Sequence, residues 1–181
     1  MKKLPTMKIL CALAVLILTA GCASTSPQLY TLSPMEKPVG ETSTLTITVG
    51  PVSLPATVNR PQLVLSVTPN QVAVDEFNRW ASPLKGDIAR VIAENLSALL
   101  GFPYVSVFPQ SVSPSYRVTI DVTRFESAPG EEARLNAIWL VRAAADGQSQ
   151  GGRTVLAELV REKTSSALVA ANSRMLGGIE R

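Results

Sequence analysis

The segment from residue 115 to residue 125 restricts the possible folds more than any other feature of the sequence. Apolar and polar side chains alternate along it from Ser115 to Thr123. The apolar positions are Tyr116, Val118, Ile120 and Val122, and the polar positions are Arg117, Thr119, Asp121 and Thr123. This period of two is typical of a strand with one face in the core and one face in water. Since the apolar face must be covered, the sequence predicts a sheet packed against a second layer.

A helix predicted over residues 82–101 supplies such a layer. Its apolar residues recur every three or four positions, which gives a single apolar face. They are Leu84, Ile88, Val91, Ile92, Leu96, Leu99 and Leu100. Ser82 suits the N-cap position and Pro83 suits the first helical position. Gly101 stands where a helix usually stops.

The remaining patterns predict further strands and one more helix. Strands are expected at 28–32, 44–49, 104–108, 134–144 and 153–163, with 62–68 and 71–75 forming a hairpin. Gly50-Pro51 should end the strand at 44–49, and a second helix is expected over 165–176 before Gly177-Gly178. Together these elements predict a single α+β domain over residues 44–181. Its sheet should be mostly antiparallel and packed by two helices.

The first residues have the composition of a secretion signal. Lys2, Lys3 and Lys8 precede an apolar run over residues 9–18 and then small residues. The run is too short to cross a hydrocarbon core, which needs about 20 residues. Residues 1–21 are therefore predicted to be a signal peptide that is removed.

Cys22 follows the small residues directly, and Leu18-Thr19-Ala20-Gly21-Cys22 resembles the bacterial lipobox, although Thr19 stands where leucine is preferred. That resemblance implies a thioether and several acyl chains on Cys22, which hold a protein firmly on a membrane. The alternative is a free thiol beside an ordinary cleavage site. Residues 22–43 would then form a lipidated tether. Ala23, in place of aspartate, favours the outer membrane, facing the periplasm, with the inner membrane as the alternative.

Charge and residue content argue against several functions. Removing the signal peptide leaves 14 Lys and Arg against 14 Asp and Glu, so the basic footprint of a nucleic-acid-binding protein is missing. The sequence contains no histidine, and Cys22 is the only cysteine after the signal peptide. The carboxylates Asp75-Glu76, Glu131-Glu132 and Asp121 fall at turns or on the polar side of a strand, as surface charges do. The prediction is a protein that is not an enzyme and needs no cofactor or metal.

Three groups of segments resemble one known family. They are Tyr30-Thr31-Leu32, then residues 50–55 (GPVSLP) with 59–64 (NRPQLV), and then residues 79–84 (RWASPL) with 90–96 (RVIAENL). In this order after a lipobox, they resemble the ABC-type transport auxiliary lipoproteins, the PqiC-like intermembrane transport family. The resemblance covers most of the chain after Cys22.

The resemblance implies a periplasmic lipoprotein of an MCE-type lipid-transport system. Its partners would be an MCE-family protein and an ABC transporter or a similar inner-membrane subunit, with the lipoprotein docked on the MCE bridge and forming homo-oligomers. Asn59 and Thr57 depart from the aspartate and the aromatic residue common in the family, so a contact made there would be altered. The C-terminal helix also looks short for the family.

Three residues are candidates for partner contact: Arg60, Gln62 and Trp80. Each has a plainer interpretation, Trp80 as a core residue and Arg60-Pro61-Gln62 as a loop entering a strand. Trp139 is expected to pack in the core. Two other functions remain open. One is a carrier that holds a lipid in an apolar cavity near Ile138, Trp139 and Leu140, and the other is a structural envelope protein.

Overall fold

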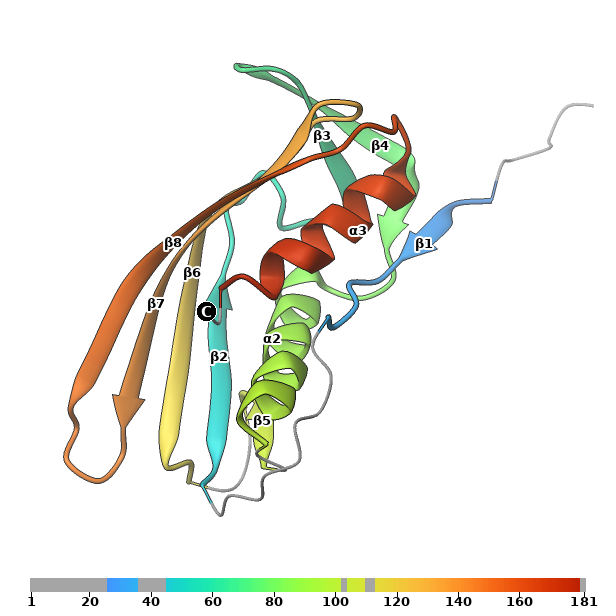
Figure 1. Ribbon diagram of the computed structural model, residues 1–181. Coiled ribbons are helices and arrows are strands. Elements are labelled where there is room, and N and C mark those ends of the chain that lie inside the picture. Colours follow the sequence, from blue (N-terminus) through green and yellow to red (C-terminus); the bar gives the residue numbers. More distant parts are fainter. Residues whose placement is uncertain (1–25, 36–44, 102–103, 110–112, 180–181) are drawn as a thin grey trace, which may run out of the picture.

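Two mixed β-sheets and two helices form the part of the chain that the computed structural model describes, residues 26–35, 45–101, 104–109 and 113–179 (Figure 1). The predicted α+β class is confirmed. The signal peptide and Cys22 lie outside the described residues.

The larger sheet has five strands in the order β5-β2-β6-β7-β8. They are β5 (Val105–Val107), β2 (Ile47–Ser53), β6 (Tyr116–Ser127), β7 (Glu132–Ala143) and β8 (Ser149–Leu159). The long strands β6, β7 and β8 are antiparallel, whereas β2 runs parallel to both β5 and β6. The predicted alternation holds in β6, where Ile120 and Val122 are buried. A bulge after Val122 then brings Phe125 to the buried face.

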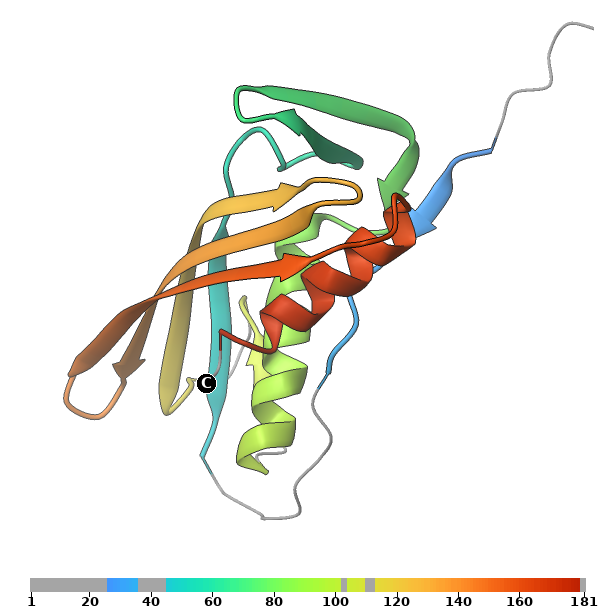
Figure 2. The same ribbon diagram turned by 45° about the horizontal axis from the view of Figure 1, so that its top comes forward.

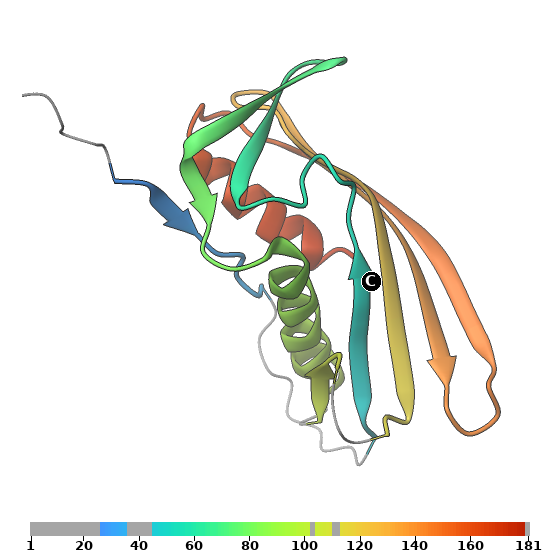
Figure 3. The same cartoon turned by 180° about the vertical axis from the view of Figure 1, so that it is seen from behind.

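The smaller sheet has the order β1-β4-β3, with β1 at Gln28–Tyr30, β3 at Gln62–Thr68 and β4 at Gln71–Trp80. β3 and β4 form the predicted antiparallel hairpin, and β1 adds to β4 in parallel. Seen from behind, the hairpin stands over the upper ends of β2 and β6 (Figure 3). The division into two sheets and the parallel pairs were not expected from the sequence, because both depend on contacts between distant segments.

The helices cover one face of the larger sheet. Helix α2 (Leu84–Leu100) packs against β2 and β5, whereas α3 (Ser165–Leu176) packs against β7 and β8. The long strands bend toward α3, which lies across this face (Figure 2). The core between the layers is aliphatic, with Ile88, Ile92, Leu135, Leu168 and Leu176 almost completely buried. No helix in the described ranges is long and apolar enough to span a membrane.

Local signals at the helix ends were only partly correct. The range predicted for α3 agrees with the structure, and Thr164 caps this helix by accepting a hydrogen bond from the Ala167 N–H at 3.2 Å. The prediction for Ser82 was wrong. Pro83 is the N-cap of α2, and no side chain caps that end, because Ser82 lies one position too early. Gly101 ends α2 in the left-handed conformation, as expected.

Several predicted strand boundaries were also wrong. β4, for example, continues to Trp80 instead of ending at residue 75. Gly50-Pro51 does not end β2, because a bulge with a cis peptide bond at this dipeptide lets pairing resume at Val52. Residues 146–152 have the composition of a turn, so the last strand was expected to begin at residue 153. β8 instead begins at Ser149, and both Gly151 and Gly152 pair with β7.

Candidate functional site

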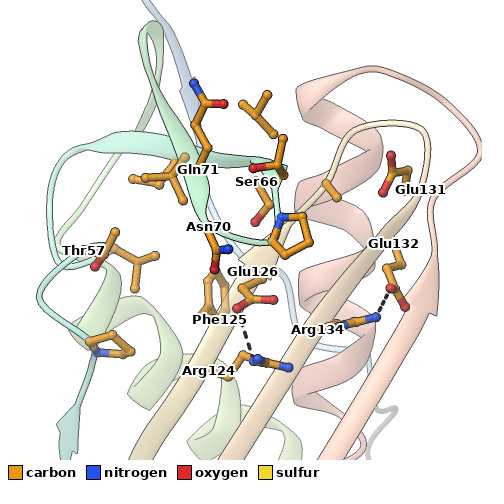
Figure 4. A pocket seen from close by; sticks show the side chains of 18 of the residues that line it. Thr57, Ser66, Asn70, Gln71, Arg124, Phe125, Glu126, Glu131, Glu132 and Arg134 are labelled. Carbon is orange, nitrogen blue, oxygen red and sulfur yellow. Dashed lines mark hydrogen bonds and ion pairs between the residues drawn. The ribbon is translucent and has the colours of Figure 1, made fainter.

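A cleft of about 520 Å³ lies between the two sheets, and we call it the inter-sheet cleft. It forms because β2 pairs with β6 only as far as Ser53 and Asp121. Beyond this point the chain leaves the sheet as a loop, and the β3–β4 hairpin stands opposite the upper part of β6. Figure 4 shows side chains of the loop, the hairpin, β6 and the β6–β7 turn pointing toward the space between them. The volume lies in the range of small-molecule sites.

The lining of the inter-sheet cleft is apolar at its base and charged at its rim. Val58, Val64 and Phe125 supply apolar surface. At the rim, the Arg124 and Glu126 side chains form an ion pair at 3.2 Å, and Arg134 pairs with Glu132. The hydrogen bond to Glu132 raises the pKa of the Arg134 guanidinium. Because these cations are paired, the cleft suits an amphipathic group better than a free anion.

Among the residues that the structure describes, no group of three or more acidic, cysteine or histidine side chains is placed to hold a metal ion. The acidic groups considered from the sequence belong to different elements, with Asp75-Glu76 on β4, Asp121 on β6 and Glu131-Glu132 at the start of β7. Asp121 accepts a hydrogen bond from the Ser53 hydroxyl, and Asp75 accepts backbone hydrogen bonds from Phe77 and Asn78.

The apolar residues of β7 that suggested a lipid cavity do not line this cleft. Ile138 and Leu140 are 48% and 44% exposed, on the side of the sheet away from the helices. Trp139 points the other way, is half-buried against the core and donates a hydrogen bond from Nε1 to the Thr154 hydroxyl at 3.2 Å. These side chains therefore do not form the inter-sheet cleft, and the core interpretation of Trp139 agrees with its packing.

The three candidates for partner contact differ in accessibility. Trp80 is only 7% exposed, and its ring meets the Phe125 ring edge-on with centroids 6.4 Å apart. Gln62 is half-buried and donates a hydrogen bond to Glu76, which also pairs with Arg79. Arg60 is exposed on the loop before β3, and its guanidinium makes no ion pair with any described residue. Of the three, Arg60 is the most accessible to a partner.

The structure also holds a site that sequence reasoning missed. Residues 28–35, within the span predicted as a tether, run across both helices, and we call them the N-terminal clasp. The Leu32 side chain is 1% exposed. The Leu32 N–H donates to Asp87 Oδ2 at 2.8 Å, while its carbonyl accepts from Arg90 Nη2 at 2.7 Å. Ser33 N–H donates to the Ser173 hydroxyl on α3.

Asp87 is the central acceptor of the N-terminal clasp. Its carboxylate is buried, accepts from the Thr31 hydroxyl at 3.1 Å and pairs with Arg90 at 2.6 Å. The hydrogen bond to Asp87 is the main reason that the pKa of the Arg90 guanidinium is raised, with Glu94 adding to it. The sequence carries one signal for this arrangement. Asp87, Arg90 and Glu94 have the spacing of ion pairs on one side of a helix, and Asp87 interrupts its apolar face.

The fold thus defines the class of protein. It is a two-layer α+β domain whose N-terminal segment is bound across the helices. The model of the family described as ABC-type transport auxiliary lipoprotein component matches residues 28–181, and the chain belongs to this family. Membership makes it a lipoprotein of the cell envelope and an auxiliary component of ABC-type transport.

Two solved structures share the fold. A crystal structure of an uncharacterized protein matches with a TM-score of 0.70 and 19% identity, covering 86% of this chain and 94% of that one. A protein from Xanthomonas campestris matches with a TM-score of 0.70 and 18% identity, covering 84% and 90%. A PelC dodecamer from Paraburkholderia phytofirmans has a TM-score of 0.44 and 14% identity, covering 82% and 93%. A search of curated protein sequences finds no match.

Proposed function

We propose that this chain is a non-catalytic component of an ABC/MCE-type intermembrane lipid-transport system. Lipidated at Cys22, it would face the periplasm from the outer membrane and dock on the MCE bridge as a homo-oligomer. The observation that carries the proposal is membership of a family of ABC transport auxiliary lipoproteins over residues 28–181. The lipobox-like sequence before Cys22 and the missing histidine support it.

Purification of the tagged, lipidated protein from gently solubilised membranes tests the proposal directly. We expect an MCE-family protein to co-purify with permease or ATPase subunits. Recovery of the protein alone, or with unrelated envelope components, would contradict the transport function and favour a structural envelope protein. Fractionation of the two membranes in the same preparation tests the outer-membrane location.

Arg60 is the residue we expect to contact the partner. Its guanidinium is exposed and has no ion-pair partner among the described residues, so it is available to a carboxylate on another protein. Arg60→Ala should weaken recovery of the MCE partner at least about tenfold, since a charged hydrogen bond contributes roughly 1.5–3 kcal/mol. Arg153→Ala, on the exposed face of β8, is the matched control. Equal recovery with both variants would rule out this contact.

A lipid carrier is the alternative function, and the inter-sheet cleft is the feature that favours it. Apolar residues at its base and paired charges at its rim fit an acyl chain with a polar end. Native mass spectrometry of the purified protein should then show a bound lipid, and Val64→Trp should remove that lipid by filling the cleft. A clean mass without ligand from wild-type protein would exclude the carrier.

A further inference from the structure

The N-terminal clasp fixes which part of the domain stays near the membrane. Only five residues separate Cys22 from the start of β1 at Gln28. A fully extended chain covers at most about 3.6 Å per residue, so β1 begins within roughly 20 Å of an anchor at Cys22. This step rests on the lipidation of Cys22 that is part of the proposed function.

The domain is longer than this tether. The 12 residues of β6 span about 40 Å at a rise of roughly 3.3 Å per residue. Figure 1 shows β1 on one side of the molecule and the β7–β8 turn on the opposite side. The hydrogen bonds of Leu32 to Asp87 and Arg90 hold the clasp on the helices, so the chain cannot lengthen its tether without breaking them. The end of the domain at β1 is therefore the end that stays near the bilayer.

Two large apolar side chains are exposed at this end. Leu29 of β1 is 64% exposed, and Phe77 of β4 is 56% exposed. They lie on paired strands, since Leu29 is in register with Arg79 and Gln28 with Asn78. Apolar and aromatic side chains beside a lipid anchor gain free energy by entering the headgroup region.

We propose that Leu29 and Phe77 contact the lipid surface to which the chain is anchored. The contact would orient the domain, with the β1–β4 edge on the bilayer and the β7–β8 turn pointing away from it. A lipid surface is favoured over a protein partner because the short tether brings this end to the bilayer whatever else is bound. A protein that covers Leu29 and Phe77 is the competing occupant, and the experiment below separates the two.

Single-cysteine labelling of the full lipidated protein tests the contact. Cys11 leaves with the signal peptide and the sulfur of Cys22 is blocked by its thioether, so an introduced cysteine is the only free thiol. Leu29→Cys, Phe77→Cys and, as a control on the opposite end, Gln150→Cys are labelled with an environment-sensitive fluorophore. The proteins are reconstituted in vesicles of phosphatidylethanolamine and phosphatidylglycerol that contain a lipid with a nitroxide on its acyl chain.

The proposal expects the nitroxide lipid to quench the probes at 29 and 77 at least about twofold more than the probe at 150. Equal quenching at all three sites would overturn it. A response at 29 and 77 that appears only when a partner protein is added would overturn it in favour of a protein interface. The mass of the N-terminal peptide shows whether Cys22 is lipidated. An unmodified Cys22 would contradict the lipid anchor of the proposed function, and with it the membrane contact.

Discussion

At the scale of single residues, Asp87 organises the end of the domain where the chain enters. One buried carboxylate receives the Leu32 N–H, the Thr31 hydroxyl and the Arg90 guanidinium. The sequence shows the spacing of Asp87, Arg90 and Glu94, but it does not show that Asp87 and Arg90 bind Thr31 and Leu32. These two residues lie 55 residues or more from Asp87 along the chain, beyond the reach of any local pattern.

Replacing Asp87 should therefore cost more than replacing its exposed neighbour. Asp87→Ala removes the acceptor of a buried N–H, and we expect a loss of about 1–3 kcal/mol in the free energy of unfolding. Glu94→Ala removes only a largely exposed ion pair with Arg90, and its effect should stay within about 0.5 kcal/mol. Urea denaturation of both variants measures the difference. Equal losses would show that the clasp is not held by Asp87.

At the scale of elements, β7 and β8 show how packing overrides a local turn signal. Gly151 and Gly152 read as a turn in the sequence, yet they pair with Leu140 and Trp139. The indole ring of Trp139 occupies the space above Gly152, where an added Cβ would lie 2.4 Å from Cζ2. The glycine thus makes room for the ring of a facing strand, which no signal within residues 144–152 reveals.

A methyl group at this position should disturb the strand pair. Gly152→Ala forces the Trp139 ring away from its hydrogen bond with Thr154, and we expect a loss of about 1–3 kcal/mol from overpacking. Gly86→Ala is the matched control, because no atom lies within 4 Å of its added Cβ. On the exposed side of α2, it should gain about 0.5–1 kcal/mol. Thermal unfolding distinguishes them, and midpoints shifted in the same direction would contradict the account.

At the scale of the whole molecule, the sequence predicted what depends on local periodicity. The range of α3, the apolar face of α2 and the buried residues of β6 follow from spacing within each segment. The pairing of β1 with β4, the separation of the sheets and the inter-sheet cleft did not follow. They require segments 50 residues or more apart to meet, as Gln28 meets Asn78. The transport function was predicted from the family resemblance and not from periodicity.

The N-terminal clasp should stabilise the rest of the domain even when it is supplied as a separate peptide. A chain that begins at Gly40 lacks Leu32 and leaves its site between the helices empty. We expect a loss of about 2–5 kcal/mol, as for a large core residue reduced to alanine. A synthetic peptide of residues 26–35 should restore part of this stability, and the same peptide with Leu32→Asp should not. Unchanged unfolding of the shortened chain would contradict the structural role of the clasp.

The clasp also determines how the molecule carries a pulling force. If Cys22 is lipidated as proposed, any load between the acyl chains and a docked partner would enter the domain at β1. Because β1 is paired with β4, a pull along the strand direction loads the hydrogen bonds of this pair in shear. The load then passes through Leu32 to Asp87 near the start of α2, a helix that packs directly on the sheet. Under the proposed anchoring, the β1–β4 pairing and the Leu32 hydrogen bonds would both have to break before the chain is pulled off the domain.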